Sequence, residues 1–228
     1  MIDFLFEYPK NAAYGRLLPK SKIFDQSRPS RTIRDRFAQE IKQIIWEYKL
    51  APETINLPQS VAVPEIQIFT IVLKDDGLKK EILECIDKSI PFPIIFELRF
   101  EEKVKVIASH KRTSESDSTK WVISDYFESD WIKADVPRRS LPIVRDLGVL
   151  YSELLTPLMP HPRQPGERLQ NYVRRMEDIQ VKKRELEKCE VRLRREKQFN
   201  RKVEINDELR ALKQQFLNMI NPLMEPTN

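Results

Sequence analysis

The sequence predicts an α+β fold: a small mixed β-sheet with the order β-α-β-β-β, covered by helices and followed by a long C-terminal helical arm. Strand-like apolar segments, with one short helical segment among them, occupy residues 65–127. A later stretch of about 50 residues carries apolar side chains at helical spacing. We therefore expect two domains, a globular α+β domain over residues 1–160 and a long basic helical arm over residues 166–221.

The first helix is predicted to begin after Ser30, because serine is favoured at helix N-caps. The residues before it contain prolines and a glycine, which predict irregular structure. The helix is expected to stop before Pro52, which cannot continue it. One helix is predicted over an apolar stripe at helical spacing that consists of Ile33, Phe37, Ile41, Ile44, Ile45 and Tyr48.

A strand is predicted over residues 65–74, which are rich in isoleucine, phenylalanine, threonine and valine. Asp75-Asp76-Gly77 predicts a turn, and residues 78–88 predict a short helix. Proline then returns the chain to an extended strand over residues 94–100. The succession of strand, helix and strand predicts a parallel, right-handed crossover.

The sheet is predicted to continue as an antiparallel meander. Glu101-Glu102 forms a tight hairpin into a strand over residues 104–109, and a polar loop leads to a further strand over residues 120–127. A helix over residues 141–158 completes the globular domain. The boundary with the arm is marked by four prolines: Pro157, Pro160, Pro162 and Pro165.

The arm contains neither glycine nor proline between Gly166 and Ile220. Its apolar residues form two stripes that are out of phase, and the shift falls in residues 196–206. A stutter, a kink or a helical hairpin would reconcile them, and we favour the hairpin or a docked second half. The stripes consist of Leu169, Tyr172, Met176, Ile179, Leu186 and Leu193, and then of Ile205, Leu209, Leu212, Phe216 and Met219.

The positive charge of the protein is concentrated in this arm. The whole chain has a net charge of +5. Residues 163–213 contain 16 basic and 10 acidic residues, which leaves the rest of the chain at −1. The high isoelectric point therefore describes the arm and not the globular domain.

Several classes of protein are not expected from this sequence. Its apolar runs, such as residues 66–73, are much shorter than the roughly 20 residues of a membrane span, and its first residues lack the order of a secretory signal. Cys85 and Cys189 predict two reduced thiols in a cytoplasmic protein. No glycine-rich phosphate loop occurs, and neither His110 nor His161 has metal-ligand spacing. We expect no cofactor and no metal site.

Three polar residues of the predicted sheet are candidates for catalysis. Glu65 and Glu97 lie on strands and Lys111 follows one, so together they suggest a metal-dependent nuclease centre. The spacing does not fit, because Glu97 is followed by Leu98-Arg99 and no Asp/Glu-x-Lys pattern occurs there. Cross-strand ion pairs on a sheet face are the alternative interpretation.

Two groups of basic residues are candidates for nucleic-acid binding. The predicted polar loop over residues 109–120 combines basic groups with hydroxyls, although Glu115 and Asp117 weaken its attraction for phosphate. The arm is the second group, but its acidic residues are interleaved as on a solvated helix, so its apolar stripe favours a protein partner over direct DNA binding, and the two are compatible. The candidates are Lys111, Arg112 and Lys120 in the loop and Arg194, Arg195, Arg201 and Lys202 in the arm.

Several strings that together extend over nearly the whole chain are similar to a known family. They are LPKSKI (18–23), LAPETINL (50–57), PEIQIF (64–69), IDK (86–88), PIIFEL (93–98), KRTSESD (111–117), KWV (120–122) and REKQFNRKVEIN (195–206). On these strings the chain resembles the bacterial domain-of-unknown-function family 4391.

The resemblance implies a setting and not a reaction. Such proteins tend to be encoded beside large helicases and DNA methyltransferases, in clusters resembling restriction or anti-phage defence systems, and no catalytic residues are assigned that could be carried over. We therefore expect a non-catalytic accessory subunit that contacts a helicase or methyltransferase and DNA. A divergent metal-dependent nuclease and a self-associating coiled-coil scaffold, which would form a homodimer, remain alternatives.

Overall fold

The computed structural model describes residues 4–114 and 121–220. Lys120, Glu115 and Asp117 of the predicted polar loop lie outside these ranges. The chain divides into two compact units, the first ending at Met159 and the second beginning at Pro160. No helix in the described ranges has both the length and the apolar character that crossing a membrane requires.

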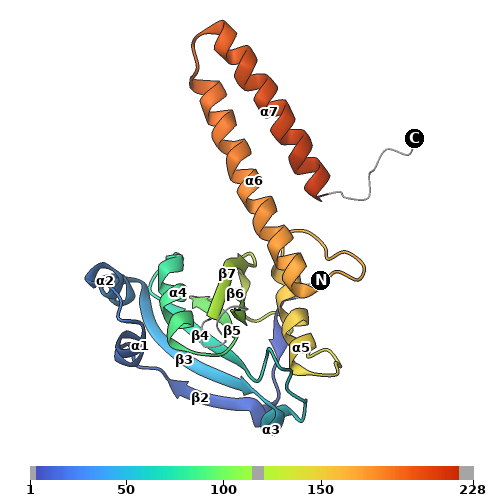
Figure 1. Cartoon of the computed structure of the whole chain (residues 1–228). Helices are drawn as coiled ribbons and strands as arrows, with labels where there is room; N and C mark the ends of the chain where they lie inside the picture. The colour runs from blue at the N-terminus through green and yellow to red at the C-terminus, as the bar shows by residue number, and fades with distance from the viewer. Residues whose placement is uncertain (1–3, 115–120, 221–228) are drawn as a thin grey trace. The chain divides into compact units, whose positions relative to one another are not determined.

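The first unit is built on a mixed, mostly antiparallel sheet of seven strands among its described residues (Figure 1). The order is β2-β3-β4-β5-β6-β7, with β8 also paired to β6, and β4 and β5 are the parallel neighbours. A separate short parallel pair joins β1 to β9. The strands are β1 (Phe6–Glu7), β2 (Ala13–Leu17), β3 (Ile41–Leu50), β4 (Ile66–Leu73), β5 (Ile94–Phe100), β6 (Lys103–Thr113), β7 (Trp121–Glu128), β8 (Ile132–Lys133) and β9 (Arg139–Ser140).

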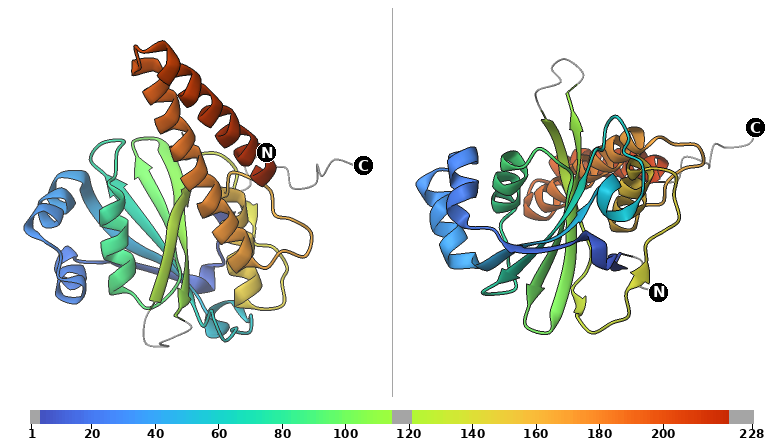
Figure 2. Two further views of the ribbon diagram at one scale, coloured as in Figure 1. Left: turned by 45° about the horizontal axis from the view of Figure 1, so that its top comes forward. Right: turned by 90° about the horizontal axis from the view of Figure 1, so that it is seen from below.

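Helices cover both faces of this sheet, with α1, α2 and α4 on one side and α5 on the other (Figure 2). The main core lies on the first side, where Phe37 of α2 and Ile82 of α4 pack with Phe69 and Phe96 of the sheet. The helical elements are η1 (Lys10–Ala12), α1 (Lys20–Ser27), α2 (Arg31–Glu40), α3 (Pro52–Ile55), α4 (Lys80–Ser89), α5 (Leu147–Leu155) and η2 (Thr156–Leu158).

The predicted strand, helix and strand between residues 65 and 100 is confirmed as β4, α4 and β5, with β4 and β5 parallel. The two antiparallel strands that follow are also confirmed as β6 and β7. The predicted set of four strands was too small. It omitted β3, which pairs antiparallel with β4, β2, which pairs antiparallel with β3, and the short β8, which pairs with β6.

The long first helix predicted from the stripe ending at Tyr48 is wrong in its second half. Ser30 does cap α2, its hydroxyl accepting from the Ile33 amide at 3.4 Å, but α2 ends at Glu40 and strand β3 follows at once. Two irregularities in the β3–β4 register interrupt the strand period of two, so the buried positions recur at intervals that imitate a helix.

The predicted polar loop also begins too early, because β6 continues through residue 113 and pairs with β7. His110, Lys111 and Arg112 therefore lie on a strand. The last helix of the unit begins later than predicted, since Asp146 caps α5 by accepting from the Val149 amide at 2.9 Å.

The second unit contains two long helices, α6 (Leu169–Arg195) and α7 (Phe199–Ile220), which pack against each other as a helical hairpin. The predicted apolar stripes meet inside it, where Cys189, Ile205 and Leu209 are buried among Leu186, Leu193 and Leu212. Two ion pairs also join the helices: Arg192 with Glu208 at 3.1 Å and Lys213 with Glu190 at 3.2 Å.

Candidate functional site

The structure does not gather the three candidate catalytic residues into one site. Side chains alternate along a strand, and Phe96 and Leu98 belong to the core beneath α4, so Glu97 between them points to the opposite face. Lys111 reaches α4 on the first face. Glu65 pairs elsewhere, with Lys49 at 3.3 Å. In the described ranges no three His, Cys, Asp or Glu side chains are placed to hold a metal ion.

Glu97 instead forms a buried ion pair on its own face of the sheet. Both of its carboxylate oxygens accept from Arg138, at 2.7 Å each, and Arg138 also donates to the Phe6 carbonyl at 2.9 Å. Glu97 is 3% exposed. The hydrogen bonds to Glu97 raise the pKa of the guanidinium above its ordinary value. Through Arg138, these hydrogen bonds connect β5 with the N-terminal segment and with the segment after β8.

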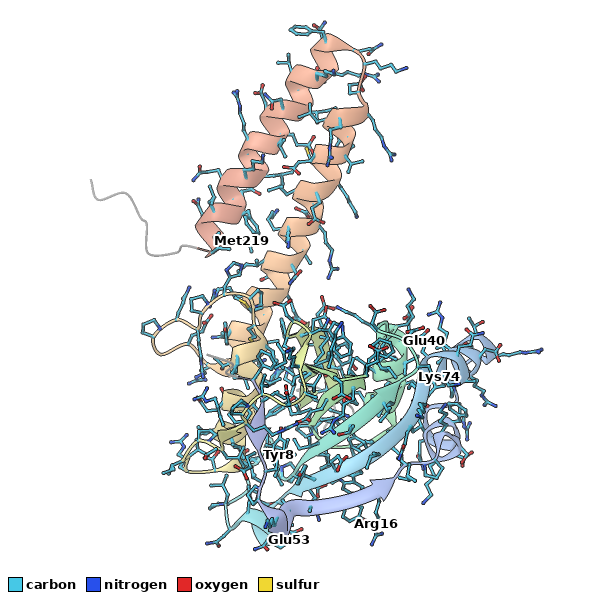
Figure 3. All side chains as sticks on the ribbon, turned by 180° about the vertical axis from the view of Figure 1, so that it is seen from behind. Tyr8, Arg16, Glu40, Glu53, Lys74 and Met219 are labelled. Carbon is cyan, nitrogen blue, oxygen red and sulfur yellow. The ribbon has the colours of Figure 1, made fainter. Side chains whose placement is uncertain are left out.

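A small cavity of about 110 Å³ lies beside this pair and includes Tyr8, Tyr48 and Thr70 in its lining. Tyr8 is labelled in Figure 3. Burial, reinforced by Glu97, raises its pKa well above the ordinary value, so the phenol is neutral. The Thr70 hydroxyl is buried without a hydrogen-bond partner in the described residues. The cavity is smaller than ligand pockets, which start at about 300 Å³.

Lys111 is buried and used inside the protein. It is 1% exposed, and its ammonium donates to the Asp87 and Ile90 carbonyls and lies 3.5 Å from the Asp87 carboxylate. Those carbonyls are at the C-terminal end of α4, where a cation opposes the partial negative charge of the helix. Lys111 thus caps α4, and its ammonium is not presented to an external phosphate.

The Asp87 carboxylate is the centre of a buried hydrogen-bond network. It accepts from the Tyr126 hydroxyl at 2.5 Å and from the Ser109 hydroxyl at 3.2 Å. Burial raises the pKa of Asp87 and lowers that of Lys111, since both charged forms lose water. From the other face, the Tyr151 hydroxyl donates to the Ser109 carbonyl at 2.6 Å and accepts from the Lys111 amide at 3.0 Å.

This network holds an irregular part of β6. The register with β7 shifts between Ser109 and Lys111, and the His110 amide donates to the Ser124 hydroxyl at 2.7 Å. Asp87 and Arg138 were not predicted from the sequence, although they pair with the catalytic candidates Lys111 and Glu97. An aspartate within an otherwise apolar helix face was the available signal for Asp87, while Arg138 lies in a segment without periodicity.

The four candidate residues of the arm are brought together by the hairpin. Arg194 and Arg195 end α6, and Arg201 and Lys202 lie in the first turn of α7. All four are exposed. We call residues 192–202 the hairpin tip. They include six basic residues and one acidic residue, a net charge of +5 that equals the net charge of the whole chain. Figure 3 shows nitrogen-ended side chains projecting from this end of the hairpin.

The basic residues of the two helices differ in what they do for their own helix. Those of α6 lie in its last turn, where a cation stabilises the helix. Arg201 and Lys202 lie in the first turn of α7, which contains no acidic residue, although the partial positive charge there favours carboxylates. Each such cation is unfavourable by a few tenths of a kcal/mol up to about 1 kcal/mol. A negatively charged group beside them would offset this cost.

The turn between the helices has a defined backbone. The Glu196 carboxylate accepts from the Lys197 amide at 2.8 Å and from the Gln198 amide at 2.9 Å. These bonds lower the pKa of Glu196, with Arg201 and Lys202 adding to the effect. An open groove of about 450 Å³ lies beside the turn and is lined by Arg192, Arg195, Glu196, Arg201, Glu204 and Ile205.

Comparisons with known proteins locate the family of this chain. Neither the search of the curated proteins nor the search of the solved structures found a match. The family model described as "Domain of unknown function (DUF4391)" matches residues 6–216. Because this match extends over nearly the whole chain, the protein belongs to that family.

Proposed function

We propose that this protein is a non-catalytic accessory subunit of a bacterial DNA-processing system, and that its hairpin tip binds the phosphates of DNA. The observation that carries the proposal is the concentration of exposed basic residues where α6 meets α7. Phosphate contacts by arginine and lysine position a protein on DNA without reading its sequence. Such a contact suits a subunit that holds other components on DNA.

The setting of this function comes from the family resemblance. We propose an anti-phage or restriction-like system in which a helicase or a DNA methyltransferase is the protein partner. The buried charges of the first unit favour a structural role for that unit, because both Lys111 and Glu97 are fully engaged by neighbouring groups. Parts of the two apolar stripes, Leu186 and Leu193 with Ile205, Leu209 and Leu212, pack against each other inside the hairpin, which supports an intrachain hairpin over a two-chain coil.

The experiment compares two variants of the full chain that lose the same number of charges. The tip variant changes Arg194, Arg195, Arg201 and Lys202 to alanine. The shaft variant changes four other exposed residues of α6 to alanine, namely Arg174, Lys183, Arg184 and Lys188. Because both variants lose four positive charges, any loss of DNA affinity that comes only from the lower net charge affects them equally.

Binding to a labelled 30-base-pair duplex is measured by fluorescence anisotropy, with and without magnesium. The wild type and the shaft variant are expected to bind, and the tip variant to lose binding on the order of a hundredfold. Equal binding by all three proteins contradicts the proposal. Cleavage of the duplex that appears only with magnesium would replace it with the nuclease alternative.

A further inference from the structure

An exposed aromatic residue lies in the middle of the basic hairpin tip. Phe199 is the first residue of α7 and is 77% exposed. Every other phenylalanine, tyrosine and tryptophan of the described residues is buried or partly buried. Isolated exposed apolar side chains are common on proteins, but an exposed phenylalanine with arginine and lysine on both sides is a specific combination.

The exposure of Phe199 does not come from a loose chain. The Glu196 carboxylate accepts hydrogen bonds from the amides of the two residues before Phe199. The Lys202 amide donates to the Gln198 carbonyl at 3.0 Å, and this bond closes the first turn of α7. The small apolar cluster of the hairpin lies further along the helices, at Cys189, Ile205 and Leu209. Phe199 therefore contributes little to packing within the hairpin.

The residues around Phe199 define what it can contact. Residues three apart on a helix are neighbours about 5–6 Å apart, so Phe199 and Lys202 share one face of α7. Arg195 and Arg201 line the open groove at the same end of the hairpin, and Phe199 and Lys202 are not among the residues that line it. A ligand complementary to this surface carries regularly spaced negative charges and flat apolar faces. Unpaired bases on a phosphate backbone have both features.

We propose that Phe199 stacks on an unpaired base of DNA while the surrounding arginine and lysine side chains hold the adjacent phosphates. The tip then prefers single-stranded DNA, or the unpaired end of a duplex, to a continuous duplex. This inference rests on the proposed function, because it requires that the tip bind DNA, and it adds the kind of DNA that is bound.

The test uses the full chain with Phe199→Ala, and Leu217→Ala as the matched control. Leu217 is an apolar residue near the other end of α7 that is 48% exposed. Affinities are measured for a 20-nucleotide oligo-dT and for a 20-base-pair duplex. Phe199→Ala is expected to weaken oligo-dT binding about tenfold, the effect of losing one stacked base, and to change duplex binding less than twofold. The salt dependence should stay as in the wild type, because no charge is removed.

A second readout reports the stacking itself. A single strand with one 2-aminopurine loses fluorescence when that base stacks on an aromatic ring. The wild type and Leu217→Ala are expected to quench it at saturation, and Phe199→Ala to quench it much less. Phe199→Trp should retain quenching and oligo-dT affinity.

Three outcomes overturn the inference. If Phe199→Ala binds oligo-dT as the wild type does while the tip variant binds neither DNA, the proposed function stands and the stacking is wrong. If the wild type binds no DNA, both are wrong. If wild-type binding to vesicles containing phosphatidylserine equals its binding to oligo-dT, and Phe199→Ala abolishes both, the tip is a membrane contact instead.

Discussion

The core of the first unit and the hairpin tip of the second use charged side chains in opposite ways. In the first unit, Lys111 and Glu97 are almost completely buried, and each is bonded to groups that the fold itself provides. At the hairpin tip, Arg194, Arg195, Arg201 and Lys202 are exposed. Residue type alone therefore does not distinguish a structural charge from a binding charge. What distinguishes them is whether the fold supplies the opposite charge and the hydrogen-bond acceptors.

The largest expected effect comes from removing a buried cation of the first unit. Lys111→Met leaves Asp87 buried without its ion-pair partner and removes the donor to the last carbonyls of α4. The free energy of unfolding should fall by about 3–5 kcal/mol in chemical denaturation. Lys103→Met, which changes an exposed lysine on the same strand, should cost less than about 0.5 kcal/mol. Similar values for the two variants would contradict the structural role of the buried lysine.

The second ion pair of the first unit should give a somewhat smaller effect. The Arg138 side chain is 26% exposed and that of Glu97 is 4% exposed, so Arg138→Ala leaves a buried carboxylate with partial access to water. We expect a loss of about 2–3 kcal/mol, below the range for a fully buried pair. Adding Glu97→Gln to Arg138→Ala should recover part of this loss. A double-mutant cycle measures the coupling free energy between the two residues. A cycle that shows no coupling would contradict the pairing.

In the hairpin, stability should depend on the apolar seam and not on the tip. Leu209 is 6% exposed in the cluster with Cys189 and Ile205, so Leu209→Ala should cost about 2 kcal/mol, at the low end for a buried leucine. The loss of helical circular dichroism on heating measures this destabilisation. The tip variant should melt within a few degrees of the wild type. Unfolding of the hairpin in the tip variant would mean that the basic residues are structural.

Histidine protonation should affect the stability of the first unit. Burial, with Arg112 adding, lowers the pKa of His110 to about 4 from its ordinary value of 6.5. The unfolded chain therefore takes up a proton at a higher pH than the folded chain does. Stability is complete above pH 6.5 and falls as the pH decreases from 6.5 toward 4. We expect about 1–2 kcal/mol of this pH dependence to disappear in His110→Gln, which denaturation at pH 7 and pH 4.5 measures. An unchanged pH profile would contradict the burial of the imidazole.

The sequence allowed prediction of those elements whose own periodicity decides their structure. The β4-α4-β5 crossover and the two stripes of the arm were identified in this way. Strand β3 was not, because two register irregularities disturb its alternation and its pairing with β4 is non-local. The structural role of Lys111 could not be predicted either, since it depends on Asp87, a residue 24 positions away that only the folded sheet brings near. At the tip, the basic residues were identified, but Phe199 was missed because one aromatic residue has no periodic signal.

The most direct test of the account is the salt dependence of DNA binding. The logarithm of the association constant is measured against the logarithm of salt concentration for the wild type, the tip variant and the shaft variant. If the tip residues contact phosphates, the slope of the tip variant should be shallower than that of the wild type by about 3, while the shaft variant keeps a slope within about 1 of it. Equal slopes for the tip and shaft variants would contradict the central claim, because the charges of the tip would then act no differently from any others on the helix.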